Sequence, residues 1–328
     1  MWGVSLFGAC PLRPLKQHLS REAQLELLKA RGLVVSDDDR ALLTIERLGY
    51  YRLSGYFYPL RRTRPVGEPG RLDDFVGGAS IELVESLAEF DKGLRLLALD
   101  AIEAIEIAVR VAVAHRLGRL NAEAHLTESL LDRGFTLPDP RGLHGTSKHQ
   151  QWIERFEEAC TKSREDFCKH HKANYGGKMP IWVAIELWDF GSLSRFFEGM
   201  QRRDQQAIAG AFGSIDGAIL TNWLRSLSFV RNVSAHHARL WNRTMVDVIK
   251  LPALERCRIL SPLHRNSRAV EKLFGPLTCA RFLLRRINPK SKWHEKLKAH
   301  IASFPATTLL SLEAAGFSTG WENEEIWR

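Results

Sequence analysis

Residues 81–117 read IELVESLAEFDKGLRLLALDAIEAIEIAVRVAVAHRL, and this stretch decides the fold class. Its apolar residues recur at three- and four-residue spacing, which is the period of a helix with one buried face. Only Gly93 interrupts it, and it contains no proline. The stretch therefore predicts one long helix or two nearly collinear helices.

Shorter helical stretches lie on both sides of it. Ser20 is an expected N-cap before a first helix that Gly32 stops, and Ser36 and Asp37 precede a second helix that Gly49 ends. Further helices are expected within 151–177, 179–200 with a break at Gly191, from 216 onward, 267–287 and 294–304. Residues 61–80, rich in proline and glycine, predict a loop, and 118–150 look irregular. No useful length of sequence alternates as a strand does, so the expected fold class is all-α.

The composition is that of an ordinary folded protein with a basic surface. Of 328 residues, 45% are hydrophobic and 26% are charged, which suits a sizeable core and not a disordered chain. The 47 lysines and arginines exceed the 38 acidic residues, giving a net charge of +9. A balance of this kind favours an anionic partner, above all nucleic acid.

The cysteine content and the length of the apolar runs together predict a cytoplasmic protein. The five cysteines are odd in number and form no CxxC motif, which suits a reducing cytoplasm better than a disulfide framework. The N-terminal stretch lacks the basic leader of a secretory signal. No apolar run has the length needed to cross a membrane. We therefore expect a cytoplasmic protein without a membrane partner.

Residues 50–64, YYRLSGYFYPLRRTR, interleave tyrosines with arginines. One interpretation is a platform that stacks bases and neutralises phosphates, with Arg52, Arg61 and Arg62 as RNA-binding residues. The other is an aromatic cluster that packs one subdomain on the next, with solvated arginines. Packing is the favoured interpretation for the tyrosines.

Residues 231–243, RNVSAHHARLWNR, concentrate polar chemistry at the end of an apolar helical stretch. If the whole stretch is helical, Asn232, His236, Arg239 and Arg243 share one face, with Arg231 about 140° away from His236 around the axis. The small residues between them would let a second copy of the helix approach through a two-fold axis. In the long helix, Glu106 and Arg110 are spaced to pair, either as a surface salt bridge or as a carboxylate and a guanidinium facing a cleft.

The motifs of several enzyme classes are absent from the sequence. The histidine pairs are adjacent, a spacing that rarely serves one metal ion, and no HExxH, GxxxxGK[ST], GxGxxG or GxSxG occurs. We therefore expect neither a metal nor a cofactor. An arginine and a histidine are sufficient for RNA cleavage through the 2′-hydroxyl, because histidine titrates near neutral pH and arginine matches phosphate geometry.

The segment from Arg231 to His236 resembles the R-x4-6-H motif of HEPN ribonucleases, with four residues between the arginine and the histidine. The surrounding sequence resembles the Abi-like abortive-infection family, of the AbiD and AbiF type. The matching blocks are LGYYRLSGY near residue 50, FDKGLRLLALDAIEAIEIAVR near 100, MPIWVAIELWDFGSLSRFF near 190, RNVSAHHARLWNR, and the closing region around Trp321 and Trp327. Together they cover about residues 16–328. Ser234 stands where we associate a cysteine with the family.

The resemblance implies a HEPN-type helical bundle with an N-terminal helical extension. The expected organisation is a loose arm at 1–15, a helical and aromatic subdomain at 16–78, and a HEPN core with C-terminal helices at 79–328. The family is usually dimeric, with two motifs meeting in one ribonuclease cleft, and serves antiphage defence through growth arrest. RNA and a second copy of the chain are the implied partners, with an antitoxin protein or a small RNA as a further one.

Roles follow from the resemblance residue by residue. Arg231 would stabilise the scissile phosphate, His236 would act as general acid and base, and Asn232 would orient the site. His237 is a second candidate at R-x5-H spacing, so the acting histidine stays open. Supporting or RNA-contacting roles fall to His237, Arg239, Arg243, Glu106 and Arg110. The alternatives are a non-catalytic RNA-binding or regulatory HEPN module, and a buried polar network that only fixes helix packing.

Overall fold

The computed structural model describes residues 15, 17–138, 145–213 and 215–328, so the arm expected at 1–15 lies outside the described residues apart from Leu15. Fifteen α-helices and one two-stranded sheet within these ranges confirm the all-α class. The chain forms two compact units, Met1–Glu85 and Ser86–Arg328. The subdomain limits and the HEPN topology expected from the sequence stay predictions.

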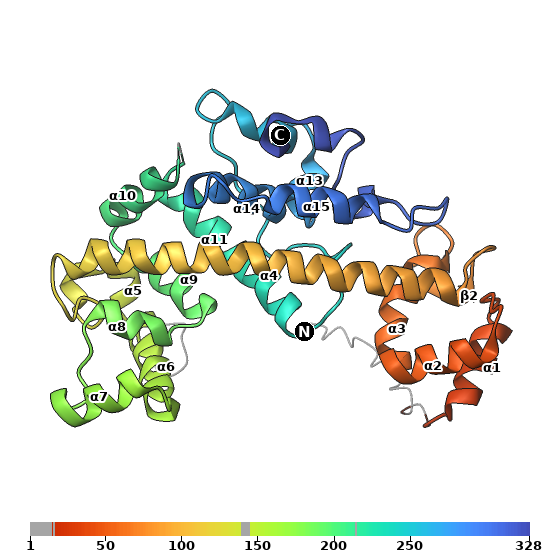
Figure 1. Cartoon of the computed structure of the whole chain (residues 1–328), viewed down its shortest axis with the longest axis horizontal. Helices are drawn as coiled ribbons and strands as arrows, with labels where there is room; N and C mark the ends of the chain where they lie inside the picture. Colours follow the sequence, from red (N-terminus) through yellow and green to blue (C-terminus); the bar gives the residue numbers. More distant parts are fainter. Residues whose placement is uncertain (1–14, 16, 139–144, 214) are drawn as a thin grey trace, which may run out of the picture. The chain divides into compact units, whose positions relative to one another are not determined.

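The N-terminal unit contains three short helices, a hairpin and the start of a long helix (Figure 1). These elements are α1 (Arg21–Ala30), α2 (Asp38–Leu48), α3 (Tyr50–Phe57), a 3-10 turn (Tyr58–Leu60), β1 (Arg61–Thr63), β2 (Arg71–Phe75) and the first turn of α4 (Ile81–Gly118). The expected N-cap at Ser20 is confirmed, because its hydroxyl accepts the Ala23 N–H at 3.2 Å. Asp37 caps α2, and Gly49 ends it with a φ of 79° that favours glycine.

The hairpin corrects the expectation of a loop at 61–80. Strands β1 and β2 pair antiparallel, with Arg61 opposite Phe75 and Thr63 opposite Arg71. The strands are only three and five residues long and mostly polar, so alternation could not reveal them. Their anchor is Phe75, which is buried with its ring 5.5 Å from that of Phe57 in an edge-on arrangement.

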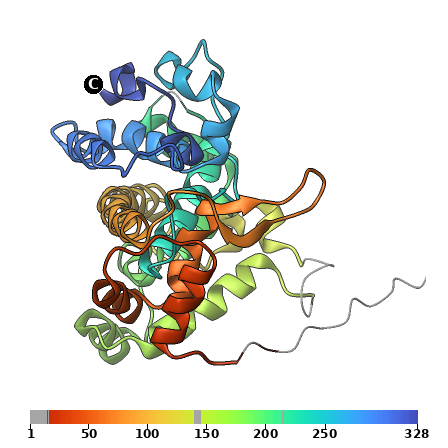
Figure 2. The ribbon, with the colours of Figure 1, turned by 90° about the vertical axis from the view of Figure 1, so that its right-hand side faces the viewer.

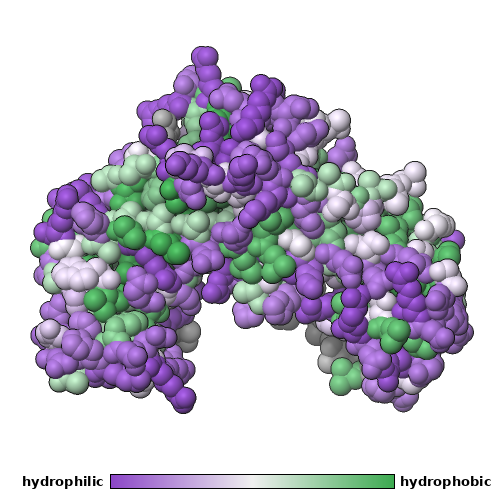
Figure 3. Space-filling model, viewed as in Figure 1, coloured by the Kyte–Doolittle hydropathy of each residue, from purple (hydrophilic) through white to green (hydrophobic). Residues whose placement is uncertain are grey.

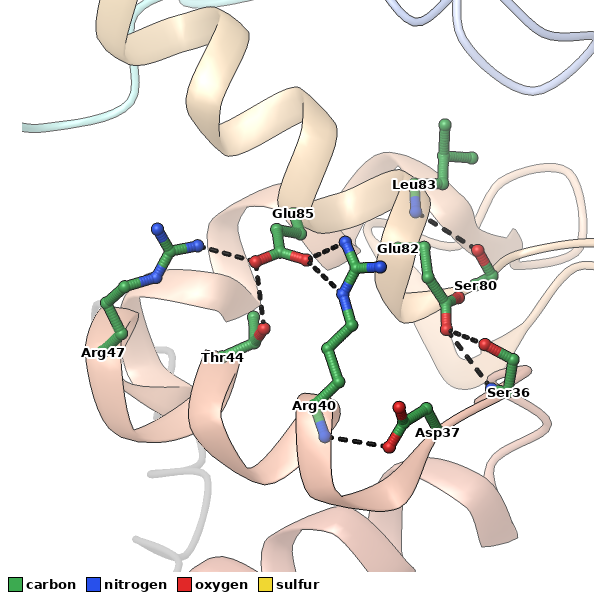
Figure 4. A network of polar contacts seen from close by, with 9 residues as sticks. All are labelled: Ser36, Asp37, Arg40, Thr44, Arg47, Ser80, Glu82, Leu83 and Glu85. Carbon is green, nitrogen blue, oxygen red and sulfur yellow. Dashed lines mark hydrogen bonds and ion pairs between the residues drawn. The ribbon is translucent and has the colours of Figure 1, made fainter.

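A charged network fixes the first turn of α4 within the N-terminal unit (Figure 4). Arg40 and Arg47 of α2 both donate to the Glu85 carboxylate, at 3.0 and 2.6 Å. Glu82 accepts from the Ser36 hydroxyl at 2.6 Å. Both arginines are more than half exposed, so each pair contributes little stability on its own.

The second unit holds the rest of α4 and the remaining helices. These are α5 (Arg133–Thr136), α6 (Lys148–Lys162), α7 (Asp166–Tyr175), α8 (Ile181–Ala184), α9 (Phe190–Glu198), α10 (Arg202–Phe212), α11 (Gly217–Ala235), α12 (Ser261–His264), α13 (Ser267–Glu271), α14 (Phe274–Ile287) and α15 (Trp293–Ala302). The single helix expected at 151–177 is two helices, and the break expected at Gly191 comes earlier because Asp189 caps α9, accepting the Ser192 N–H at 2.6 Å.

The long helix α4 is unbroken, so of the two arrangements that its sequence allows, the single long helix is the one observed. In the second unit it buries a face at three- and four-residue spacing: Phe90, Leu94, Ala98, Ala101, Ile102, Ile105, Val109, Val113 and Leu117. Figure 2 views α4 nearly end-on, with α15 beside it. The Trp293 indole donates to the Leu97 carbonyl at 2.8 Å, and the His300 ring stacks on Phe90. Gly93 permits this approach, because a Cβ there would collide with the His300 ring.

Helix α11, which carries the start of the motif, is enclosed by neighbouring helices. Asp216 caps its start, accepting the Ile219 N–H at 2.9 Å, and the helix packs against α9, α10 and α14. Its buried side chains include Leu220, Trp223, Leu224, Leu227 and Val230. Enclosure of this kind holds the C-terminal end of α11 in a defined position. In the described ranges, no helix has the length and apolarity of a membrane span.

Candidate active site

The motif lies at the C-terminal end of α11, and the helix stops inside it. The last helical residue is Ala235, and His236 is the C-cap with a φ of −87°. His237 has a φ of 56° and is the only non-glycine residue with positive φ in the described part of the chain. The expectation that Asn232, His236, Arg239 and Arg243 share one helical face is therefore wrong, because the chain has left the helix at His237.

The end of α11 is a Schellman motif with histidine in the left-handed position. The His237 N–H donates to the Ser234 carbonyl at 3.0 Å, and the Ala238 N–H donates to the Val233 carbonyl at 2.9 Å. Glycine usually occupies this position, because a side chain costs about 1–2 kcal/mol in left-handed backbone. A strained residue held by its surroundings is a recurrent feature of functional sites.

The polar side chains of the motif face solvent. Asn232, His236 and His237 are exposed, whereas Val233 and Ser234 are buried. Neither imidazole makes a hydrogen bond or ion pair with the residues that the structure describes. The interpretation of the cluster as a buried polar network is therefore wrong, and both histidines are available to a ligand.

Arg231 lies beside an acidic and a basic side chain of α4. Its guanidinium donates to the Asn232 side-chain oxygen at 3.3 Å and interacts electrostatically with Glu106. Glu106 in turn accepts from Arg110 at 2.5 Å, and Arg110 also donates to the Trp188 carbonyl at 2.6 Å. The fold thus brings Arg231, Asn232, Glu106 and Arg110 together.

Burial sets the protonation of Glu106. Desolvation raises its pKa, while the positive charges of Arg110 and Arg231 act in the opposite direction and Asp189 raises it further. Its side chain is 15% exposed. Glu106 and the Arg231 guanidinium thus influence one another through their charges, with no direct ion pair between them in the described residues.

A second carboxylate of α4, which the sequence analysis missed, holds the loop after the motif. Asp91 is fully buried and accepts the Leu240 N–H at 3.0 Å and the Trp241 N–H at 2.7 Å. Arg95, one turn along α4, donates to Asp91 at 2.6 Å and reaches the Ala238 carbonyl at 3.5 Å. The pair thus fixes the backbone immediately after His237. Asp91 and Arg95 stand in FDKGLR, but only the tertiary contact reveals their role.

The loop that follows Trp241 returns along α11. The Asn222 side chain donates to the Val248 carbonyl at 3.0 Å, and the Trp223 indole donates to the Lys250 carbonyl at 2.8 Å. Within the loop, the Arg243 guanidinium donates to the Arg239 carbonyl at 3.0 Å and lies 6.0 Å from the centre of the Phe229 ring. Arg239 and Arg243 therefore belong to the motif loop and not to the helix.

The three arginines expected to bind RNA near residue 60 belong to the N-terminal unit. Arg61 pairs with Asp73 at 3.2 Å, and Arg62 donates to the Phe75 carbonyl at 3.2 Å, so both stabilise the hairpin. Arg52 is exposed on α3. No group of three or more histidine, cysteine, aspartate or glutamate side chains is placed to hold a metal ion in the described ranges.

Comparison with known proteins identifies the family. No curated protein and no solved structure matches the chain. A sequence model of Abi-like proteins matches residues 43–242, a range that includes α4 and the motif at the end of α11. Because this match covers more than half of the 328 residues, the chain belongs to the Abi-like protein family.

Proposed function

We propose that this protein is a metal-independent endoribonuclease of the HEPN type that serves abortive-infection or toxin-type antiphage defence. Membership of the Abi-like family supports the defence role. The observation that carries the enzymatic proposal is the end of α11, where Arg231 in the last turn and two exposed histidines just past the helix end lie close together, the histidines without partners among the described residues.

The chemistry needs only these groups and the RNA itself. A histidine removes the proton of the 2′-hydroxyl, and the 2′-oxygen forms a bond to the adjacent phosphorus. The bond from phosphorus to the 5′-oxygen breaks, and a protonated histidine supplies the proton that this oxygen needs. The products are a 2′,3′-cyclic phosphate and a 5′-hydroxyl. Arg231 stabilises the negative charge on the phosphorane, with Asn232 and Glu106 orienting its guanidinium.

A two-fold dimer would supply the second proton-transfer group. Beside Glu106 and Arg110, α4 presents Ile107 and Val111, which are 52% and 61% exposed, and Trp182 of α8 is 52% exposed. Apolar surface gathers over the C-terminal half of α4 in Figure 3. Exposed apolar patches of this kind suit an isologous contact with a second copy of the chain. Light scattering at micromolar concentration should give about twice the chain mass; a monomer that cleaves RNA would exclude a composite site.

Substitution of the two motif residues tests the proposal. Arg231→Ala and His236→Ala should each reduce RNA cleavage by about 100-fold or more, because each removes a group used in the transition state. Their circular dichroism and melting temperature should match the wild type, since neither side chain is part of the core. Arg202→Ala, an exposed arginine of α10, is the matched control and should cleave normally.

Product analysis tests the mechanism. Cleavage should persist in excess EDTA and yield a 2′,3′-cyclic phosphate and a 5′-hydroxyl, and a 2′-deoxy substitution at the scissile nucleotide should block it. Magnesium-dependent activity or 5′-phosphate products would contradict the mechanism. RNA that binds but is never cleaved would favour the non-catalytic RNA-binding module.

A further inference from the structure

Two hollows of the second unit meet beside the motif and form one groove between α6, α9 and α11. Their volumes are about 550 and 830 Å³. Both are lined by the same five residues, Trp152, Arg155, Gly191, Arg195 and Asn232. We call this shared stretch the central groove. It contains two arginines and no acidic side chain.

The central groove is built on packed elements. The Trp152 indole of α6 donates to the Ser192 carbonyl of α9 at 3.1 Å, which fixes the two helices together. Arg155 lies three residues after Trp152 on α6, and Arg195 lies on α9; both side chains are exposed. Asn232 completes the lining from α11 and holds the Arg231 guanidinium. The groove therefore reaches the residue that binds Arg231, the proposed ligand of the scissile phosphate.

The charges along the groove divide into engaged and unengaged groups. The carboxylates of both hollows already have partners: Asp132 accepts from Gly134, Asp189 from Ser192, Glu158 pairs with Lys162, and Glu198 and Asp247 both pair with Arg225. The side chains of three cations make no hydrogen bond or ion pair with the described residues: Arg155, Arg195 and Lys148. Cations left without partners in a concave site are suited to phosphate oxygens.

We propose that the central groove binds the phosphodiester backbone of single-stranded RNA next to the scissile bond, with Arg155 and Arg195 as phosphate ligands and Lys148 as a further contact. This assignment rests on the proposed function, because Arg231 defines where the strand is cut. Each hollow has the volume of a site for a drug-sized molecule, so together they take a short strand and not an isolated ion. A single strand can enter a hollow of this size, whereas a duplex presents its phosphates on a wide cylinder.

Binding of an uncleavable strand separates the groove from the chemistry. The probe is a fluorescent 2′-O-methyl RNA of about 12 nucleotides, which spans a typical single-strand site but lacks the nucleophile. Its affinity is measured by anisotropy at several salt concentrations. Arg155→Ala/Arg195→Ala should bind at least about tenfold more weakly, and the slope of log K against log salt should fall by about 1.4 because two phosphate contacts are lost.

The matched control is Arg202→Ala/Arg268→Ala, which removes two exposed arginines that line neither hollow and should leave the affinity and the slope near those of the wild type. Equal binding by the groove variant and the wild type would overturn the proposal, and so would displacement of the strand by adenosine monophosphate at matched nucleotide concentration. The same experiments distinguish failure of the groove from failure of the proposed function. If the wild-type protein binds RNA through the groove but cleaves none, the proposed function is contradicted and strand binding by the groove is not. If the protein cleaves RNA and the groove variant binds the strand normally, only the groove assignment is contradicted.

Discussion

Two carboxylate–arginine pairs stand on α4 at the same spacing, and they do different things. Asp91 and Arg95 are 0% and 9% exposed at their side chains, and Asp91 also holds the backbone of Leu240 and Trp241. Glu106 and Arg110 are 15% and 18% exposed, and the positive charge of Arg231 acts on the Glu106 carboxyl. The first pair fixes the chain after the motif, and the second lies near Arg231, which the proposed chemistry needs.

The i,i+4 spacing along the helix determines which carboxylate and arginine can pair. The role of each pair depends on the tertiary partners that it contacts. A buried ion pair is stable only when further hydrogen bonds satisfy its groups, as the two loop N–H groups do for Asp91. Within the described part of the chain, Glu106 receives no comparable set of backbone donors, and its raised pKa reflects a burial that its neighbours only partly offset. Asp91 is therefore expected to matter for stability and Glu106 for the site.

The largest effect that sharpens this comparison is expected for Asp91→Asn. The change removes the charge opposite Arg95 and should lower the free energy of unfolding by about 3–5 kcal/mol, because a buried cation loses its counterion. Urea unfolding followed by circular dichroism measures this. Glu106→Gln is the matched control, since it makes the same change one pair further along α4 and should cost no more than about 1 kcal/mol.

A double variant checks the physical reason. Replacing Arg95 with methionine in the Asp91→Asn background removes the buried positive charge and should recover part of the lost stability. Equal losses of unfolding free energy for Asp91→Asn and Glu106→Gln would contradict the different roles assigned to the two pairs. A double variant less stable than Asp91→Asn alone would contradict them as well.

A smaller effect is expected from Glu106→Gln as a function of pH. Burial raises the folded pKa of Glu106 above its ordinary value of 4.5, so the unfolded chain loses the proton first as the pH rises. The wild type should therefore lose stability relative to the Gln variant from about pH 4.5 upward, until the pH has passed the folded pKa. Melting temperatures of both proteins between pH 4 and 8 measure this. A constant difference across the range would contradict the raised pKa.

The same variant tests the positioning role. If Glu106 orients Arg231, cleavage by Glu106→Gln should fall by about tenfold through kcat, with RNA affinity little changed, since the contact matters most in the transition state. Unchanged kcat would leave Glu106 as a structural neighbour only.

Sequence reasoning predicted the helices better than their ends and their partners. The apolar period of 81–117 is local and strong, so α4 was predictable over its full length, and so were the cap at Ser20 and the start of α2 near Ser36 and Asp37. The hairpin was not predicted because its strands are short and polar. Asp91 and Arg95 escaped because their partners lie some 150 residues further along the chain, and no local pattern encodes that contact.

The end of α11 shows the same limit within the motif. Continuing the helical period past Ala235 placed Arg239 and Arg243 on a helix face, although the chain turns at His237. Histidine is not a usual helix stop, so no composition rule signalled the end. The turn depends on tertiary contacts of the following loop, in particular the hold of Asp91 on Leu240 and Trp241.

The smallest expected effect concerns His237, and it decides which histidine acts. His237→Gly should raise the free energy of unfolding by about 0.5–1 kcal/mol, because glycine adopts the left-handed backbone without the cost that a side chain meets there. His237→Ala keeps that cost and should bring no such gain. If His236 is the catalytic histidine, the glycine variant cleaves RNA at nearly the wild-type rate while His236→Ala does not. A glycine variant that is more stable but inactive would assign the chemistry to His237 at R-x5-H spacing, because loss of fold could not then explain the loss of cleavage.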